Sequence, residues 1–178
     1  MKLLGISGSL REGSYNTTLL RNVDAEIELW DELKELPPYD EDDDVNPVPP
    51  AVARIRAAVA GADAVLFSTP EYNGSVPGVL KNAVDWLSRP RGEAALLNKP
   101  VAVVGATTGM FGAVWAQADL RRILKTAGAR VLESELPVAK AHELFDDDGR
   151  LLDEDLRDKL QEIVAELQAQ VCADLVAA

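Results

Sequence analysis

Polar residues that can hold an anion follow the first apolar run of the sequence. The stretch GSLREGSYNTTLL (Gly8–Leu20) comes after a short apolar segment and ends in a leucine pair, which predicts a strand, a loop and a helix. Four side chains of this loop can converge on one anion: Ser9, Arg11, Ser14 and Asn16. A single arginine among hydroxyl groups suits a terminal monophosphate better than a triphosphate with its magnesium ion.

The start of the following helix is expected to add backbone donors. Asn16 is a suitable N-cap, so Thr17 and Thr18 would present free N–H groups to the same anion. Neither the dinucleotide fingerprint nor the Lys-Ser/Thr phosphate loop is present. Asp31 has the place of a ribose-binding acid, but the glycine pattern that would support this role is missing. On this segment alone, an ordinary capped loop with a surface arginine remains an alternative.

A second candidate loop reads TPEYNGSVP and follows the third apolar run. Its prolines and glycine predict a rigid, extended loop with backbone N–H groups exposed along one edge. A tyrosine face with polar neighbours is what a planar heteroaromatic ring needs. The residues expected to contact such a ring are Pro70, Glu71, Tyr72, Asn73 and Gly74. Taken by itself, the segment is equally well explained as a turn between core elements.

A third loop, GATTGMFG (Gly105–Gly112), follows the fourth apolar run. Its small residues allow a ligand to approach the backbone closely, and Thr107, Thr108 and Gly109 offer hydroxyl and N–H donors. Ligands of open parallel sheets bind beyond the carboxyl ends of the strands, so the three loops should meet at one edge. A phosphate site beside a ring-stacking site describes flavin mononucleotide (FMN).

The elements that must position these loops alternate along the chain. The expected strands are Lys2–Ser7, Ala25–Trp30, Ala64–Thr69, Val101–Thr107 and Ala129–Glu133. Amphipathic stripes predict helices between and after them, with Gly61 as the C-cap of one and Pro77 in the first turn of the next. This strand–helix alternation predicts a doubly wound α/β sheet. We expect residues 1–178 to form a single domain.

Composition narrows the classes of partner. The chain has 178 residues, of which 47% are hydrophobic and 27% are charged, as in ordinary soluble globular proteins. A formal net charge of −12 argues against binding to nucleic acid or to anionic membrane surfaces. The single cysteine, Cys172, excludes an intrachain disulfide framework, and the first apolar run is too short for a signal peptide. We therefore expect a cytoplasmic protein, with the acidic run Asp40–Asp44 in a solvated loop.

Three segments together resemble the NAD(P)H-dependent FMN reductase family. They are GISGSLREGSYN, TPEYNGSVPGVLKNAVDWLSR and GATTGMFGAVWAQADLRRIL. The resemblance implies a flavodoxin-like three-layer αβα sandwich with a five-stranded parallel sheet in the order 2-1-3-4-5. It also implies that the FMN phosphate lies in the Ser9–Thr17 loop and that the ring lies against Pro70–Gly74 and Thr107–Gly109.

The resemblance further implies assembly and activity. Related proteins form homodimers or homotetramers, in which a neighbouring subunit helps to wall the flavin site. This chain has Trp115 where many members carry an arginine before the A-Q-x-x-L-R segment. The implied reaction passes a hydride from NADPH or NADH through bound FMN to a quinone-like or other small acceptor. No side chain is expected to be catalytic and no metal is needed, because the flavin carries the chemistry.

Two other functions remain open. The protein can use free FMN as a substrate and release it reduced, or it can be a flavodoxin-type electron carrier without its own nicotinamide reaction. The carrier is disfavoured because the chain lacks the T-x-T-G-x-T phosphate loop that is typical of flavodoxins. His142 and Cys172 are expected to be a capping or solvent-facing residue and a packing residue, respectively.

Overall fold

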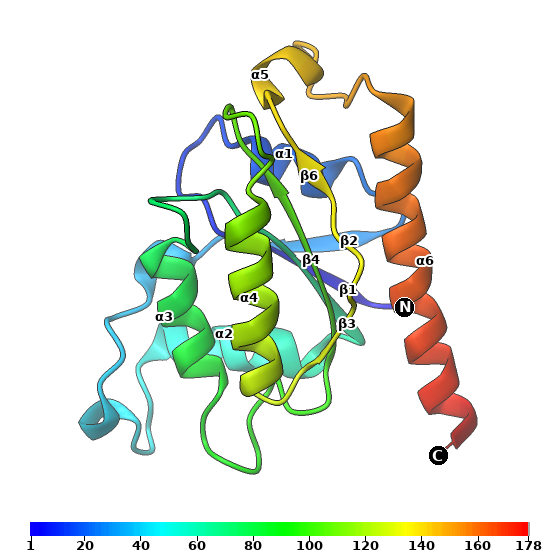
Figure 1. The fold of residues 1–178 in the computed structure, drawn as a ribbon. Helices are drawn as coiled ribbons and strands as arrows, with labels where there is room; N and C mark the ends of the chain where they lie inside the picture. Colours follow the sequence, from blue (N-terminus) through cyan, green and yellow to red (C-terminus); the bar gives the residue numbers. More distant parts are fainter. Residues whose placement is uncertain (178) are drawn as a thin grey trace.

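A parallel sheet carries the three candidate loops. The computed structural model describes the backbone of residues 1–177 and the side chains of residues 1–173. The strands are β1 (Leu3–Ser7), β2 (Ile27–Trp30), β3 (Ala64–Ser68), β4 (Pro100–Ala106) and β5 (Arg130–Val131). They pair in parallel in the order β2-β1-β3-β4-β5 (Figure 1), which confirms the predicted topology.

The fifth position of the sheet is occupied by two short strands. β5 pairs with the start of β4, and β6 (Pro137–Val138) pairs with its end at Gly105 and Ala106. The expected strand Ala129–Glu133 is therefore too long. Between the two pieces the N–H group of Leu136 bonds to the side-chain carbonyl of Gln117 at 3.3 Å, while its own carbonyl accepts from the Gly105 N–H of β4 at 3.1 Å.

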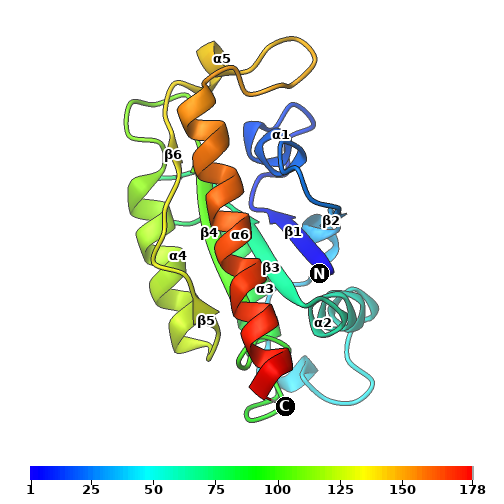
Figure 2. The same ribbon diagram turned by 90° about the vertical axis from the view of Figure 1, so that its right-hand side faces the viewer.

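Helices cover both faces of the sheet (Figures 1 and 2). On one face lie α2 (Pro50–Gly61), α3 (Gly78–Leu87) and α4 (Val114–Thr126). On the other lie α1 (Tyr15–Arg21) and the long α6 (Glu154–Ala177). The short α5 (Ala141–Leu144) follows β6, and two 3₁₀ turns, η1 (Leu33–Glu35) and η2 (Glu41–Asp43), lie between β2 and α2.

Strand side chains alternate between the two layers of core. Val65 and Phe67 pack toward α2, α3 and α4, whereas Ala64 and Leu66 pack toward α1 and α6. Because both faces are covered, β3 and β4 are buried at every position and apolar except for Ser68 at the end of β3, as the uninterrupted apolar runs predicted. The result is the expected three-layer arrangement.

Two predicted helix boundaries are wrong. Gly61 is the last residue of α2 and does not adopt a left-handed conformation; Ala62 follows it with an extended backbone as the C-cap. Pro77 precedes α3 as its N-cap and accepts hydrogen bonds through its carbonyl from the N–H groups of Leu80 and Lys81, so it lies outside the first turn. The apolar pattern therefore placed the start of α3 too early along the chain.

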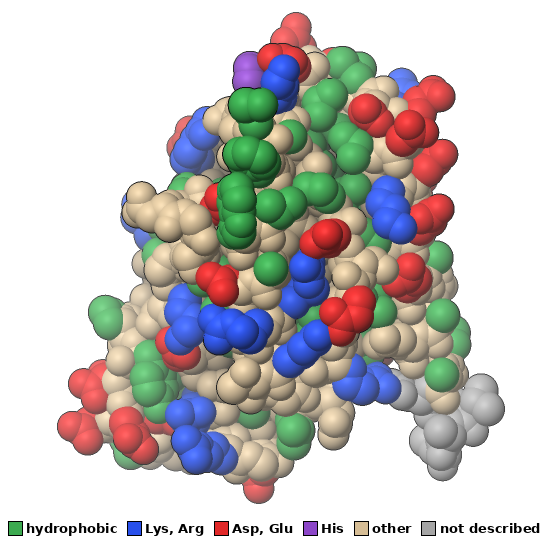
Figure 3. Space-filling view, viewed as in Figure 1, with side chains coloured by type: hydrophobic (Ala, Val, Ile, Leu, Met, Phe, Trp, Pro, Cys, Tyr) green, Lys and Arg blue, Asp and Glu red, His purple; other side chains and the backbone are tan. Residues whose placement is uncertain are grey.

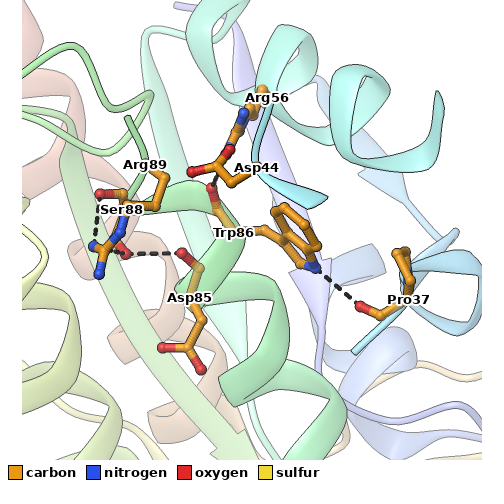
Figure 4. A network of polar contacts seen from close by, with 7 residues as sticks. All are labelled: Pro37, Asp44, Arg56, Asp85, Trp86, Ser88 and Arg89. Atoms are coloured by element: carbon orange, nitrogen blue, oxygen red, sulfur yellow. Dashed lines mark hydrogen bonds and ion pairs between the residues drawn. The ribbon is translucent and has the colours of Figure 1, made fainter. Parts of the chain in front are cut away.

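The acidic segment before α2 is anchored at one end (Figure 4). Asp40–Asp43 are exposed as expected, but the Asp44 carboxylate pairs with the Arg56 guanidinium at 2.8 Å, with side chains only 12% and 16% exposed. Arg56 also donates from two nitrogens to the Trp86 carbonyl at the end of α3, at 3.1 and 3.0 Å. The indole N–H of Trp86 donates to the Pro37 carbonyl at 2.9 Å. One guanidinium therefore joins α2, α3 and the irregular segment.

Replacing Arg56 with Ala should lower the free energy of unfolding by about 2–3 kcal/mol, because it leaves a largely buried carboxylate and a carbonyl without their donor. Urea unfolding followed by tryptophan fluorescence measures this loss. Arg54→Ala on the same helix is the matched control, because Arg54 pairs with Glu32 and Glu35 at the exposed surface and should matter less. Equal losses of unfolding free energy in the two variants would contradict the role of Arg56 as the link between α2, α3 and the irregular segment.

Candidate functional site

The three loops leave the sheet at the same edge. Ser7 at the end of β1 pairs in register with Ser68 of β3, which pairs with Val104 of β4. The chain passes from β2 across β1 to β3, so the direction of strand addition reverses beside β1. This is the position where open α/β sheets bind ligands.

The first loop ends in a helix cap that differs from the predicted one. Ser14, not Asn16, is the N-cap of α1: its hydroxyl oxygen accepts from the Thr17 N–H at 3.2 Å. The Thr18 N–H donates to the Ser14 carbonyl at 2.9 Å. The N–H groups of Thr17 and Thr18 are therefore not free. Within the described part of the chain, the N–H groups at the helix start without a hydrogen bond are those of Tyr15 and Asn16.

The side chain of Asn16 is part of the core. It is 3% exposed, and its NH₂ group donates to the Ala106 carbonyl at 2.9 Å. Its oxygen accepts from the Ser68 hydroxyl at 2.9 Å and from the Ala106 N–H at 3.0 Å. These bonds hold the carboxamide at the ends of β3 and β4, and its contact with a phosphate stays a prediction.

The remaining polar groups of the first loop form a preordered turn. The Ser7 hydroxyl oxygen accepts from the Ser9 N–H at 3.3 Å, and the Ser9 hydroxyl oxygen accepts from the Arg11 N–H at 3.5 Å. The exposed Arg11 guanidinium donates to the Gly13 carbonyl at 3.4 Å and makes no ion pair within the described residues. The hydroxyl protons of Ser9 and Ser14 and the charge of Arg11 remain available to an anion.

The second loop is a tight turn rather than the expected extended segment. Tyr72 and Ser75 exchange two backbone hydrogen bonds, of 3.0 and 3.2 Å. Asn73 and Gly74 between them have φ values of 53° and 75°, a left-handed pair typical of an Asn-Gly hairpin turn. The turn leaves the Tyr72 side chain half exposed.

Both ends of this turn are fastened to α4. The Glu71 carboxylate accepts from the N–H groups of Trp115 and Ala116, at 3.1 and 3.2 Å, and so caps a helix whose N-cap residue supplies no side-chain bond. Glu71 is therefore a helix cap, and its contact with a ring stays a prediction. The Ser75 hydroxyl donates to the Asp119 carboxylate at 2.8 Å, which holds the pKa of that carboxyl below its usual value.

The third loop is also closed by local hydrogen bonds. The Gly109 N–H donates to the Thr107 hydroxyl oxygen at 3.2 Å, so this N–H is not the open donor that the sequence indicated. The carbonyls of Gly109 and Thr107 accept from the N–H groups of Lys140 and Ala141, both at 2.9 Å. Thr108 is exposed at the tip. The loop is thereby tied to the segment after β6.

Sequence reasoning missed Gln117, which is fully buried. Its amide donates to the Gly112 carbonyl at 2.8 Å, while its carbonyl accepts from the Leu136 N–H. It therefore holds the third loop against the segment between β5 and β6. A signal was present: Gln117 is a polar residue beside Ala116 and Leu120 on the apolar stripe of α4.

Large apolar side chains are exposed beside the second and third loops (Figure 3). Met110, Phe111 and Trp115 are 73%, 59% and 51% exposed, and the last two rings meet edge to face with centroids 4.9 Å apart. Together with Tyr72 they form what we call the apolar rim. An exposed apolar group of this kind is typical of a surface that binds an apolar ligand or another protein.

Two other features of the described residues bear on function. No group of three or more His, Cys, Asp or Glu side chains in that part of the chain is arranged to hold a metal ion. Among its helices, none combines the length and apolar character needed to cross a bilayer.

The sheet order and the ligand-type loops at its carboxyl edge define a flavodoxin-like α/β protein. Residues 1–143 match the family model of the NADPH-dependent FMN reductases. The chain is 44% identical to an NAD(P)H-dependent FMN reductase of Pseudomonas aeruginosa, over 96% of this chain and 95% of the relative. The chain therefore belongs to the NADPH-dependent FMN reductase family, which confirms the resemblance.

Other relatives agree with this assignment. A 2-hydroxy-1,4-benzoquinone reductase of a Burkholderia species is 34% identical over 96% of each chain. Among solved structures, the flavoenzyme NAD(P)H:(acceptor) oxidoreductase of Paracoccus denitrificans superposes with a TM-score of 0.82 at 34% identity, covering 96% of this chain and 97% of that one. The flavodoxin-like fold is thus confirmed by comparison as well as by topology.

Replacing Glu71 with Ala should lower the free energy of unfolding by about 1 kcal/mol, because α4 loses its cap. Glu71→Gln should lose about half as much, since its amide oxygen still accepts both N–H groups and only the charge–dipole attraction disappears. Urea unfolding of the two variants, beside the exposed control Glu26→Ala, tests this order. A Gln variant as unstable as the Ala variant would show that capping is not the role of Glu71.

Proposed function

We propose that this protein is an NAD(P)H-dependent flavoprotein reductase that transfers hydride from NADPH or NADH through FMN to quinone-like or other small acceptors. The observation that carries the proposal is the convergence of the loops after β1, β3 and β4 at one sheet edge, in a chain of the FMN reductase family. Relatives named quinone reductase support the acceptor class.

The first loop fits the phosphate of FMN. Arg11 is an exposed cation that makes no ion pair with any described residue, and the start of α1 offers the N–H groups of Tyr15 and Asn16. Helix N-termini attract anions through these donors and the helix dipole. The proposed phosphate contacts are the side chains of Ser9, Arg11, Ser14 and Thr17, with Asn16 contributing through its backbone only.

The second and third loops fit the flavin ring. Tyr72 presents a half-exposed planar face, and the backbone N–H groups of Asn73 and Gly74 lie beside it at the tip of a turn held from both ends. Fixed N–H groups stabilise negative charge where it develops on a bound ring. The proposed ring contacts are Pro70, Tyr72, Asn73, Gly74, Thr107, Thr108 and Gly109.

FMN, when bound by these residues, would supply the two-electron chemistry that links the nicotinamide to the acceptor. The protein positions the reactants: the fastened turn fixes one wall, and the apolar rim excludes water from a stacked planar acceptor. No side chain is assigned a catalytic role. His142 and Cys172 are both exposed and lie outside the three loops, on α5 and α6.

Assembly, location and domain organisation belong to the same proposal. Met110, Phe111 and Trp115 leave apolar surface at the site that a second copy can cover, which supports a homodimer or homotetramer. The Trp115 indole, at the position where related chains have arginine, would then add apolar contact rather than charge. We further propose a single-domain cytoplasmic enzyme that, with a net charge of −12, does not bind nucleic acid.

One observation favours a second function, reduction of FMN as a free substrate. The side chains of Asn16 and Glu71 are engaged within the protein, so they add nothing to flavin affinity. Fewer contacts favour exchange of FMN over permanent retention. An electron carrier without a nicotinamide reaction receives no such support in this family.

Anaerobic mixing of the purified protein with NADPH or NADH tests the function. A yellow preparation should lose its flavin absorbance without any partner reductase and regain it when a benzoquinone is added. A colourless preparation that oxidises NADPH only with added FMN would favour the free-flavin reaction. Flavin that binds but is bleached by neither nicotinamide would overturn both.

Replacing Arg11 with Ala should weaken FMN binding about tenfold to hundredfold, because a hydrogen bond to a charged group contributes about 1.5–3 kcal/mol. Fluorescence titration of apoprotein with FMN measures this change. The matched control is Arg91→Ala, an exposed arginine without an ion pair in the described residues, in the loop after α3. Unchanged FMN affinity in the Arg11 variant would argue against the phosphate assignment.

A further inference from the structure

A second pocket adjoins the proposed phosphate loop on the side of β2. It has a volume of about 320 Å³ and lies between α1 and the segment that follows β2. Ser9, Arg11 and Thr17 line it on one side, so it shares a wall with the proposed FMN phosphate site. A volume in this range suits part of a small ligand. The proposed ring contacts belong to the loops after β3 and β4 and do not line this pocket, so the part of it beyond the shared wall has no assigned ligand.

Unpaired cations surround the pocket. Arg11, Arg21 and Lys34 line it, and none of them makes an ion pair with a carboxylate in the described part of the chain. Two carboxylates, Glu12 and Asp31, also line the pocket, so cations exceed carboxylates in its lining although the whole chain has a net charge of −12. The cations indicate a ligand with one or more phosphate groups.

The neighbours of Lys34 explain why its ammonium group has no carboxylate partner among the described residues. Glu32 and Glu35 lie within two residues of Lys34, but both carboxylates bond to the guanidinium of Arg54 on α2, each at 2.5 Å. These carboxylates are therefore directed to the α2 surface. Lys34 remains on the pocket side with no carboxylate partner among the described residues.

The rest of the lining suits a nucleoside. Leu20, Leu29 and Leu33 form apolar walls together with Trp30. Asp31 follows β2 directly and makes no ion pair within the described residues. A carboxylate after the second strand accepts hydrogen bonds from ribose hydroxyls in nucleotide-binding sheets. Apolar walls, a hydroxyl acceptor and surrounding cations together match a phosphorylated nucleoside.

We propose that this pocket binds a phosphorylated adenosine group. This inference rests on the proposed function, because the nicotinamide co-substrate carries such a group. Two ligands carry such a group: NADPH, at its 2′-phosphoadenosine end, and flavin adenine dinucleotide (FAD), in its adenylate. The first phosphate of FAD would lie in the Ser9–Thr17 loop. Arg21 and Lys34 bind the phosphate, and Asp31 accepts from the ribose.

Isothermal titration of the FMN-loaded protein with 2′,5′-ADP, and of the apoprotein with 5′-AMP and FAD, tests the pocket. At least one probe should bind, and the double substitution Arg21→Gln with Lys34→Gln should weaken it at least about tenfold. FMN affinity should stay unchanged, which excludes a folding defect. Arg91→Gln is the matched control: Arg91 is an exposed arginine that does not line this pocket, so its replacement should leave probe binding intact.

The two sources give different results. Weakened 2′,5′-ADP binding with a higher KM for NADPH but not NADH identifies the NADPH end, whereas loss of FAD affinity relative to FMN identifies the adenylate of FAD. Either result supports the proposal. Absence of binding by every probe, or equal losses in the double variant and the control, overturns it. Probe binding without FMN binding would instead refute the proposed function and leave the pocket standing.

Discussion

The carboxyl edge of the sheet depends on one buried carboxamide. Strands β3 and β4 end side by side, and polar groups at their ends are shielded from water by α1. Asn16 satisfies three of these groups at once, the Ser68 hydroxyl and both backbone groups of Ala106. Because an unmet buried polar group is costly, the position of α1 relative to the two strands is narrowly fixed. The Ser14 cap and the loop before it are therefore held at a constant distance from the loops after β3 and β4.

The α4 helix plays the corresponding role on the other face. Its first N–H groups bind Glu71, its second turn presents Asp119 to Ser75, and Gln117 between them holds Gly112. The second and third loops are thus both held by hydrogen bonds to one rigid element, α4. A ring placed against both loops meets walls that move together, which is the condition for a reproducible stacking distance.

The sequence predicted the strands and the three loops, because these follow from apolar runs and turn residues that are local in sequence. The strand order came from the resemblance to the FMN reductase family, not from these local patterns. The errors concern side chains whose partners are distant. Asn16 bonds to Ala106 across 90 positions, and the local pattern predicted it as the helix N-cap that the structure places at Ser14. Glu71 bonds to Trp115 across 44 positions, so its role as a helix cap could not be read from the residues beside it. The Gln117 side chain likewise bonds to Leu136, in the segment that separates β5 from β6. A local sequence pattern does not reveal such distant hydrogen-bond partners.

An acidic protein that binds anions must rely on local rather than global charge. At physiological ionic strength the screening length is about 8 Å, so most of the −12 net charge is not felt at the sheet edge. What matters is which cations lack a carboxylate nearby. On the α2 and α4 surfaces Arg54, Arg121 and Lys125 are paired with glutamates. Around the first loop Arg11 has no ion pair within the described residues, so its charge stays available to a phosphate there.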